Sequence, residues 1–309
     1  MNNSVLNLIG NTPVVKINNI KKNKNKNINV YAKLESFNPG GSIKDRIAAK
    51  MIEKAEQEKK LNRKKTIIEA SSGNTAIGLA LVSKIKGYNF TAVMSKSVSE
   101  ERRKILRSYG ASIILTSKKE KTDGAIRLVN KLVEKHPERF YNPNQFSNKY
   151  NYLTHYYSTG PELWKQLNGN IDYFIAGIGT SGTIRGVGKY LKEKNKNIKI
   201  IGVLPEKEHG IQGLKNLEES IIPDIYNDKI IDIFINVNTE KSYKNARDLS
   251  KTEGIFAGMS SGASFLGVKK LIKEIDRGNV ATIFPDGGEK YLSTNLYQNK
   301  SNSGKRASI

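Results

Sequence analysis

Residues 173–192 read YFIAGIGTSGTIRGVGKYLK, and this stretch decides the fold class. Its first four residues, Tyr173–Ala176, form a short apolar run typical of a buried strand. A turn rich in glycine and hydroxyl residues follows over Gly177–Thr183, and Ile184–Lys192 then has the pattern of a helix. A strand, a glycine-rich turn and a helix in this order predict part of a parallel sheet with helices packed on it.

The same alternation of strand and helix extends through the whole chain. Its 309 residues are enough for two domains with separate cores. We therefore expect an α/β fold in which parallel-rich, twisted sheets are flanked by helices. The other expected strands are Asn29–Leu34, Thr66–Glu69, Phe90–Met94, Ser112–Leu115, Ile198–Leu204 and Val280–Phe284, and Ser99–Tyr109 is expected to be helical.

Residue types that are absent or rare exclude several classes of chemistry. The chain has no cysteine, which rules out disulfides, zinc–thiolate sites, iron–sulfur clusters and a cysteine nucleophile. His136, His155 and His209 lie far apart without ligand spacing, so we expect neither a metal site nor a Ser-His-Asp triad. Each histidine is expected in a loop or at a helix end.

The chain is strongly basic, with 52 Lys and Arg against 29 Asp and Glu and a net charge of +23. Such a balance alone favours nucleic acid or anionic surfaces as partners. The densest basic run, Lys21–Asn27, contains no aromatic residue on which bases could stack, and no DNA-binding motif is evident. We therefore expect no nucleic-acid partner and interpret the charge as surface chemistry that can attract small anionic ligands.

The sequence has no segment with the features of a membrane span or a signal peptide. No apolar run approaches the roughly eighteen residues that a span requires, and Met1–Pro13 has neither a basic start nor an apolar stretch. These observations predict a cytoplasmic protein without membrane contact. The polar tail over residues 301–309 is expected to be disordered.

Three turns rich in glycine and hydroxyl residues are candidate anion sites, because the amides and dipole at a helix start favour phosphate or carboxylate. The first, Ser71–Thr75, lies before a helix expected over Ala76–Lys86, and its polar groups suit a carboxylate. They also suit an ordinary helix cap. The third, Gly258–Ala263, precedes a helix expected over Ala263–Ile275, and a serine there could bond a buried partner or simply cap the helix.

The second turn, Gly177–Thr183, has two functional interpretations. Its glycines match the dinucleotide pattern G-x-G-x-x-G, and Glu206 follows the next strand about where a ribose-binding acid should lie. The hydroxyl residues at positions 180, 181 and 183 argue against a dinucleotide. They suit the terminal phosphate of a monoester, whereas a pyrophosphate is bound over a close-packed turn.

A fourth segment places Lys44 in the first turn of a helix that begins just after a glycine pair, in NPGGSI at 38–43. Ser42 and Asp45 have the spacing of a capping box, with Asp in place of the usual Glu. Apolar residues then recur every four positions and predict one buried helix face: Ile43, Ile47, Met51 and Ala55.

In order and spacing, these four segments resemble the cysteine synthase and cystathionine β-synthase family, whose members are fold-type II pyridoxal phosphate enzymes with a tryptophan synthase β-like fold. The resemblance covers nearly the whole chain. Further matching motifs are LIGNTP at 8–13, QF at 145–146, TGPEL at 159–163, EGI at 253–255 and YLST at 291–294.

The resemblance implies a role for individual residues. Lys44 looks like the lysine that forms the internal aldimine with pyridoxal phosphate and also acts as the general base. Asn74 matches the residue that bonds the cofactor's ring hydroxyl, and Ser260 the residue that faces the pyridine nitrogen. The phosphate cup matches Gly179, Thr180, Ser181, Gly182 and Thr183, and the site of the substrate carboxylate matches Ser71, Ser72, Thr75 and Gln145.

The family's chemistry implies β-replacement on a serine- or cysteine-type amino acid through an aminoacrylate intermediate. The first hypothesis is a cysteine synthase that joins activated serine and sulfide into L-cysteine. The alternative within the class starts from L-cysteine, releases hydrogen sulfide and forms lanthionine, serine or cystathionine. Hypotheses from other classes are an NAD-dependent dehydrogenase built on Gly177–Gly182 and a basic nucleic-acid-binding protein.

Several positions depart from the family's usual pattern, among them Ser181 in the phosphate cup and the segment Pro285–Lys290. Lys215 could meet a phosphate or carboxylate of a substrate, or be solvated surface. Asp232 could approach the mouth of the site and activate a water or thiol, or be a charge at a strand edge.

The resemblance further implies a homodimer and two domains. Residues 1–36 with 149–309 would form the larger domain, which holds the cofactor phosphate. Residues 37–148 would form a smaller, mobile domain that carries the turn at 71–75 and closes on the substrate carboxylate.

Overall fold

A computed structural model describes residues 3–20, 27–71 and 73–298 of the chain. The basic run at 21–26, Ser72 and the tail at 301–309 lie outside the described residues, and so do the expectations that concern them. Within the described ranges, no helix is long and apolar enough to cross a membrane.

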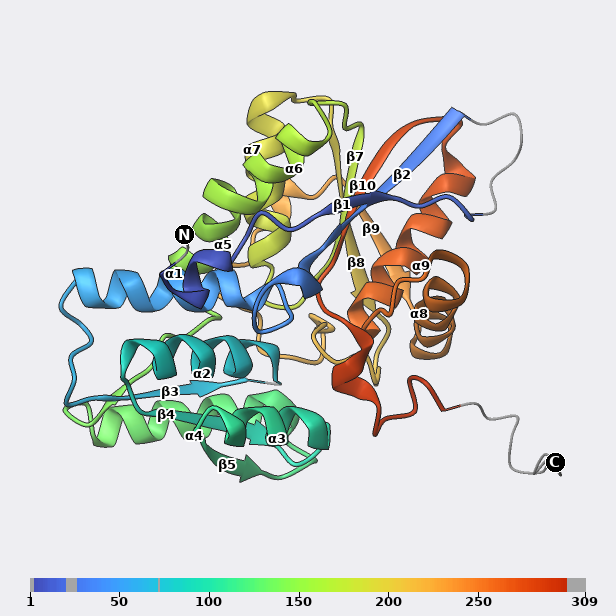
Figure 1. Ribbon diagram of the computed structural model, residues 1–309. Helices are drawn as coiled ribbons and strands as arrows, with labels where there is room; N and C mark the ends of the chain where they lie inside the picture. Colours follow the sequence, from blue (N-terminus) through green and yellow to red (C-terminus); the bar gives the residue numbers. More distant parts are fainter. Residues whose placement is uncertain (1–2, 21–26, 72, 299–309) are drawn as a thin grey trace, which may run out of the picture.

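The larger sheet has the strand order β1-β2-β10-β7-β8-β9. All neighbouring strands in it are parallel except β1, which pairs antiparallel with β2 at one edge. Helices cover both faces, with α5, α6 and α7 on one side and α8 and α9 on the other (Figure 1). The strands are β1 (Val14–Lys16), β2 (Asn27–Leu34), β7 (Tyr173–Gly177), β8 (Lys199–Pro205), β9 (Ile233–Val237) and β10 (Arg277–Phe284), and the helices are α5 (Lys149–Thr154), α6 (Gly160–Gln166), α7 (Gly182–Lys194), α8 (Thr239–Glu253) and α9 (Met259–Glu274).

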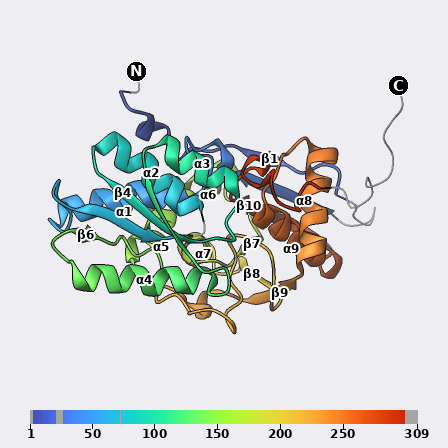
Figure 2. The ribbon, with the colours of Figure 1, turned by 90° about the horizontal axis from the view of Figure 1, so that it is seen from below.

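The smaller sheet is parallel throughout and has the order β5-β4-β3-β6. Helices α2 and α3 lie on one side of it and α4 on the other (Figure 2). Its strands are β3 (Thr66–Ala70), β4 (Phe90–Ser95), β5 (Ser112–Thr116) and β6 (Phe140–Tyr141), and the helices are α2 (Asn74–Lys86), α3 (Glu100–Ser108) and α4 (Lys121–Lys135).

Helix α1 (Lys44–Gln57) packs against both α2 and α5 and so lies between the two layers. The predicted apolar face is confirmed, since Ile43, Ile47, Met51 and Ala55 are all at most 2% exposed. Ile43 belongs to the core beneath the larger sheet, whereas Ala55 belongs to the core of the smaller one. One amphipathic stripe therefore ties the two parts of the molecule together.

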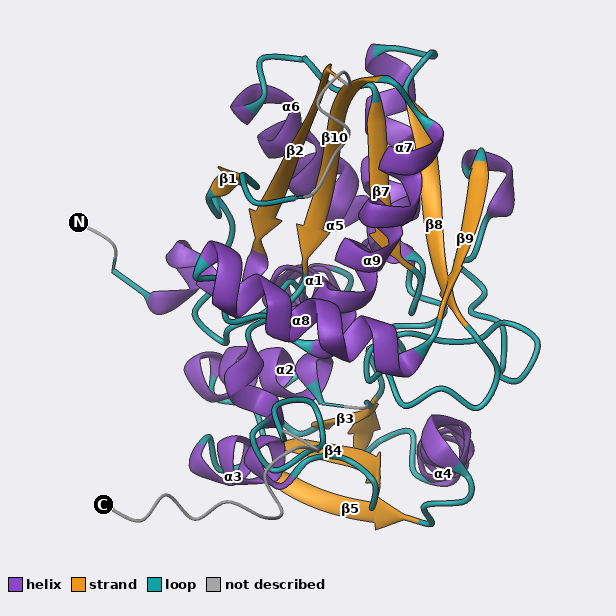
Figure 3. Cartoon of the chain, turned by 90° about the vertical axis from the view of Figure 1, so that its right-hand side faces the viewer, coloured by secondary structure: helices purple, strands orange, loops and turns teal. Residues whose placement is uncertain are grey.

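The strands of the larger sheet run toward the smaller sheet, as the arrowheads of β2 and β10 show in Figure 3. In parallel sheets the turns that follow the strands gather at the carboxyl edge, which is where open α/β sheets bind ligands. The turns after β3 and β7 and the segment after β10 therefore lie at carboxyl edges, where ligand sites are expected.

All seven predicted strands are present, with ends displaced by up to three residues. The edge strands β1, β6 and β9 were not predicted, and β1 and β6 are only three and two residues long. In β9 the residues Ile233 and Phe234 remain exposed, so the strand lacks the continuous burial that marks the central ones.

Candidate active site

Lys44 is the first residue of α1, and its side chain is only partly exposed to solvent. Burial lowers the pKa of this amine to about 8, although the carboxylates of Asp286 and Glu35 pull in the opposite direction. An amine with this pKa is partly neutral at physiological pH, so it can act as a nucleophile or accept a proton.

The capping box predicted for this helix is not formed. Ser42 Oγ accepts from the backbone N–H of Lys44 at 3.2 Å, and the Asp45 carboxylate accepts from the N–H of Gly40 at 2.5 Å. The chain turns tightly through the glycine pair, so that Asp45 reaches the loop before the helix rather than the cap residue. Both side chains thereby hold the loop that leads into Lys44.

The turn after β3 is organised by Ser71, whose Oγ accepts from the backbone N–H groups of Gly73 and Ala76, each at 3.1 Å. Ser71 lies two residues before the N-cap Gly73, and its hydroxyl still satisfies an N–H in the first turn of α2. Both lone pairs of its hydroxyl are used, so the hydroxyl can meet a ligand only as a donor. Thr75 donates to Gln145 Oε1 at 2.6 Å, and Gln145 Nε2 donates to the carbonyl of Ala70 at 3.0 Å.

Beneath this turn lies the carboxyl group of Glu69, which is 1% exposed. Burial raises its pKa to about 8, although the backbone N–H of Gln145 opposes the shift. The group is therefore neutral in the folded protein at pH 7 but ionised in the unfolded chain. Since the unfolded chain releases this proton from about pH 4.5 upward, Glu69 makes folding less favourable as the pH rises toward 8.

We expect Glu69→Gln to stabilise the protein increasingly between pH 5 and pH 8, by about 4 kcal/mol at the upper end. The substitution keeps the shape of the neutral acid and removes the cost of suppressing its ionisation. Urea unfolding of both proteins at several pH values measures the effect. A difference in free energy of unfolding that stays constant over this range would contradict the assigned pKa.

The glycine-rich turn after β7 leads directly into α7. Ser181 has a φ of 68°, in the left-handed region, which gives a physical reason why glycine suits this position. Its hydroxyl oxygen is buried and has no hydrogen-bond partner. A Cβ at Gly179 would lie 2.2 Å from the carbonyl oxygen of Gly213, so only glycine fits there. An orphaned hydroxyl at the start of a helix is a ready partner for a bound anion.

Asn151 on α5 connects this turn with the turn after β3, and the sequence analysis missed it. Its Nδ2 donates to the carbonyl of Gln145 at 2.7 Å and to Thr180 Oγ1 at 3.1 Å. A Cβ at Gly182 would lie 1.9 Å from Asn151 Oδ1. The fit of Asn151 against Gly182 therefore joins two sites that lie far apart in the sequence.

His155 lies at a helix end, as predicted, because it caps the C-terminus of α5 and begins a helical turn over His155–Thr159. Its complete burial there could not be predicted from the sequence. Its ring contacts Thr159 Oγ1 at 2.9 Å and Thr183 Oγ1 at 3.4 Å. Burial, reinforced by the charges of Lys44 and Arg46, holds its pKa well below the usual range. A neutral imidazole therefore supports Thr183.

Ser260 lies within the first turn of α9, because that helix begins at Met259 rather than at the expected Ala263. The side chain is 5% exposed, and its Oγ would be 3.8 Å from a Cβ at Gly213. Gly213 also contacts Gly179, so Ser260 lies near the turn after β7. Ser261 instead donates to the carbonyl of Asp286 at 3.1 Å.

The structure does not bring Asp232 to this region. Asp232 precedes β9, and so lies at the amino ends of the parallel strands, opposite the glycine-rich turns. Its carboxylate pairs with Lys192 at 2.8 Å and accepts from the backbone N–H of Ile200 at 2.7 Å. The hypothesis that Asp232 activates a water or thiol is therefore wrong, and the strand-edge interpretation is correct.

Lys215 is neither solvated surface nor directed at an open site. It is 8% exposed, pairs with Asp123 of α4 at 3.3 Å and donates to the carbonyl of Ile221 at 3.2 Å. Asp123 also accepts from the N–H of Ile221 at 3.2 Å. The lysine thus links the loop after β8 to the part of the molecule built on the smaller sheet.

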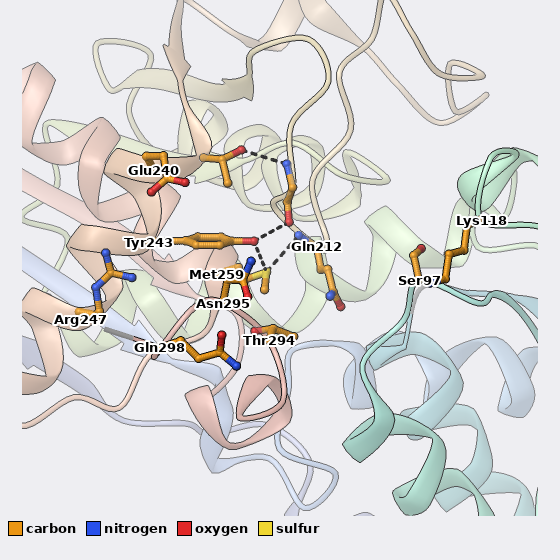
Figure 4. A pocket seen from close by; sticks show the side chains of 12 residues that line it. Ser97, Lys118, Gln212, Glu240, Tyr243, Arg247, Met259, Thr294, Asn295 and Gln298 are labelled. Carbon is orange, nitrogen blue, oxygen red and sulfur yellow. Dashed lines mark hydrogen bonds between the residues drawn. The ribbon is translucent and has the colours of Figure 1, made fainter. Parts of the chain in front are cut away.

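A pocket of about 900 Å³ lies next to the segments that carry Gly213 and Ser260, but none of the candidate site residues that the structure describes lines it. Ser97 and Lys118, which follow β4 and β5, lie on one side of it, and residues of α8 lie on the other (Figure 4). Gln212 and Met259, the neighbours of Gly213 and Ser260, also line it. The volume is sufficient for an amino-acid-sized ligand.

The model of the family described as "Pyridoxal-phosphate dependent enzyme" matches residues 5–286. The chain belongs to this family. Pyridoxal phosphate is therefore its cofactor, and the nicotinamide interpretation of Gly177–Gly182 is wrong, because the match includes that turn. This family assignment confirms the fold-type II architecture that the sequence predicted.

Relatives within the family are cysteine synthases and similar enzymes. The cysteine synthase of Aquifex aeolicus is 45% identical over 303 residues, covering 96% of this chain and 93% of that protein. The crystal structure of cysteine synthase from Entamoeba histolytica superposes with a TM-score of 0.91 at 37% identity, covering 98% and 93% of the two chains. A hydrogen sulfide-producing enzyme of Fusobacterium nucleatum gives 0.90 at 40% identity, covering 94% and 100%. The chain is therefore an enzyme of the cysteine synthase type.

Proposed function

We propose that this enzyme replaces the β-substituent of a serine- or cysteine-type amino acid, and that its principal reaction joins an activated serine and sulfide into L-cysteine. The observation that carries the proposal is Lys44, an amine with a pKa of about 8 at the first residue of α1. Its relatives named as cysteine synthases support the choice of reaction.

The turn after β7 is suited to the phosphate of the cofactor. The unpartnered hydroxyl of Ser181 and the start of α7 supply donors, and Gly179 leaves the backbone bare. Thr180 is held by Asn151 and Thr183 by His155, so the hydroxyls of the cup are oriented in advance. We assign Asn74 to the ring hydroxyl and Ser260 to the pyridine nitrogen.

We expect Gly182→Ala to weaken the binding of pyridoxal phosphate by about 10- to 100-fold, because the new methyl group would displace Asn151 from the cup. Gly188→Ala on the same helix is the control, since its Cβ would lie 3.2 Å from the flexible side chain of Ile200. Fluorescence titration of the apoproteins with the cofactor measures the dissociation constants. Equal weakening in both variants would contradict a specific effect on the cup.

Ser71, Thr75 and Gln145 form the proposed site for the substrate carboxylate, together with Ser72, which lies outside the described residues. The Ser71 hydroxyl can act only as a donor, and the Gln145 amide keeps a second N–H beside the one that bonds Ala70. Hydrogen-bond donors of this kind suit an anion. A carboxylate bound there would be held beside the first turn of α2.

Lys44 would carry the covalent chemistry. Its neutral amine would hold the cofactor by condensing with its aldehyde, with loss of water. Once released by the substrate amine, it would accept the proton from the substrate α-carbon. The bound cofactor supplies an electron sink for the pair that this proton leaves behind. The β-substituent departs with its bonding pair, and sulfide supplies the new pair to the β-carbon.

A second reaction of the same class would start from L-cysteine and release hydrogen sulfide, forming lanthionine, serine or cystathionine. One observation favours keeping it: the Fusobacterium relative is named for hydrogen sulfide production.

The smaller sheet belongs to residues 66–141, which supports the proposed division into a domain of residues 37–148 and one of residues 1–36 with 149–309. We also propose a homodimer. In its support, Leu8 is 52% and Phe37 66% exposed on neighbouring segments joined by the Gly10 N–H to Asn38 Oδ1 bond. The cytoplasm is the proposed compartment because free amino acids and sulfide are the proposed substrates.

The decisive experiment offers the enzyme O-acetylserine, O-phosphoserine, serine and cysteine in turn, with and without sulfide, and measures cysteine formed and sulfide released. Net cysteine from an activated serine supports the principal reaction, whereas sulfide release from cysteine supports the second. If the enzyme holds its cofactor and none of the four donors is turned over, the proposed substrate class is wrong.

A further inference from the structure

The side chain of Asn74 is held from two sides by residues that follow β10. Its Nδ2 donates to Asp286 Oδ2 at 2.7 Å, and its Oδ1 lies 3.4 Å from Lys290 Nζ. An amide placed between a carboxylate and an ammonium has only one favourable orientation, because the reversed amide would set oxygen against oxygen and nitrogen against nitrogen. The second N–H of Nδ2 is then the hydrogen that Asn74 can offer to a ligand.

Asp286 is itself firmly placed. It is 2% exposed, and its Oδ2 also accepts from the hydroxyl of Tyr291 at 2.6 Å. The guanidinium of Arg102 lies 3.6 Å from the same oxygen. Oδ1 is buried without a hydrogen-bond partner, and a Cβ at Gly258 would lie 2.0 Å from it. The carboxylate thus has one oxygen committed to its neighbours and one left to act through its charge.

Lys290 is equally constrained. It is 2% exposed, and its Nζ donates to the carbonyls of Gly40 and Gly41 at 2.9 and 2.8 Å. These glycines precede Lys44, so one lysine touches both the loop before α1 and the amide at the start of α2. The charged and titratable groups around Asp286 are Lys44 on α1, Arg102 on α3, and Lys290, Tyr291 and Tyr297 after β10, with Asp45 and Glu289 facing Lys290.

We propose that Asp286 is a positioning residue, which turns an N–H of Asn74 toward the ring hydroxyl of the cofactor and keeps a negative charge next to the backbone at Ser42 and Ile43 that leads into Lys44. The inference rests on the proposed function, in which Asn74 and Lys44 hold the cofactor. Lys290 fixes the amide oxygen of Asn74, as Asp286 fixes its amide nitrogen. The pair of residues at 286 and 290 belongs to the segment in which this chain departs from the usual family pattern.

Asp286→Asn tests the charge, because it keeps the size of the side chain. A protonated linkage between Lys44 and the cofactor absorbs at a different wavelength from the neutral one, so its pH titration can be followed in the visible spectrum. Removal of the nearby negative charge disfavours the cation, and the midpoint should fall by about one pH unit or more. Asp232→Asn, the same change at an acid on the opposite edge of the sheet, should leave the midpoint unchanged.

A double-mutant cycle tests the positioning. The dissociation constant of pyridoxal phosphate is measured for the wild type, Asn74→Ala, Asp286→Asn and the double variant, with thermal unfolding as a check of folding. If Asp286 acts through Asn74, each single change weakens binding and the double variant is little weaker than Asn74→Ala alone. Lys290→Met should weaken binding and couple to Asn74→Ala in the same way.

The outcomes separate the inference from the function on which it rests. Additive effects in the cycle, or a titration midpoint that Asp286→Asn leaves in place, overturn the positioning role. A wild type that binds no cofactor through Lys44 overturns the proposed function itself. If Asp286→Asn does not fold, the double-mutant cycle is carried out with Lys290→Met and Asn74→Ala instead. Additive effects of these two substitutions on cofactor binding would overturn the inference as well.

Discussion

Lys44→Ala should lose covalent attachment of pyridoxal phosphate and lower the rate of β-replacement by at least about 10³-fold. The expected loss is large because a single amine both bonds the cofactor and takes the substrate proton. The purified variant should lack the visible absorption of the bound cofactor. Rates are measured with the best donor and sulfide, and borohydride reduction followed by mass spectrometry locates the attached lysine.

Two controls separate the nucleophile from its charge and from general effects on α1. Lys44→Arg keeps a cation but cannot form the bond, so it should be as inactive as the alanine variant. Lys50 lies on the same helix with its side chain 38% exposed, and Lys50→Ala should retain activity. Covalent cofactor found on another lysine of the Lys44→Ala protein would refute the assignment.

Arg46→Ala should lower the free energy of unfolding by about 3–5 kcal/mol, because it leaves the buried Glu35 without its ion-pair partner and Glu162 with Lys33 alone. The guanidinium is bound through paired contacts to Glu35 at 2.7 and 2.9 Å and to Glu162 at 2.6 and 2.7 Å. Arg46 and Glu35 are almost fully buried. Urea unfolding measures the loss, and Lys50→Ala, which breaks only the exposed pair with Glu53, should cost less than about 1 kcal/mol.

The loss at Arg46 should also depend on pH. Burial raises the pKa of Glu162, but the hydrogen bonds and charges of Arg46 and Lys33 prevail and lower it to about 2. The stability that this gives is complete above the unfolded pKa of about 4.5 and disappears as the pH falls toward 2. The difference between the wild type and Arg46→Ala should therefore shrink below pH 4. A difference independent of pH would show that packing, not charge, accounts for the loss.

The site could be predicted from the sequence where its residues are neighbours in a turn. The strand, glycine-rich turn and helix around Gly177–Thr183 follow local rules, and so does the placement of Lys44 at a helix start after two glycines. The apolar face of α1 was predicted correctly because its spacing depends only on the helical repeat. The structure confirms these elements with small changes at their ends.

The supporting residues could not be predicted in this way. The bond between Asn74 and Asp286 joins residues 212 positions apart, and that between Asn151 and Thr180 joins residues 29 apart. The burial that keeps His155 neutral is likewise produced by the surrounding elements. Asp232 was misplaced for the same reason, since nothing near it in the chain tells which end of the sheet it occupies.

The alternation of strands and helices, the anion-binding turns and the family could thus be inferred from the sequence, because these features depend on residues within a few positions of one another. Packing of distant segments establishes which carboxylate faces Asn74, which lysine fixes its amide, and which buried groups change their pKa. Desolvation and hydrogen bonds between distant segments arise when the two sheets pack together around α1, and no local pattern records them.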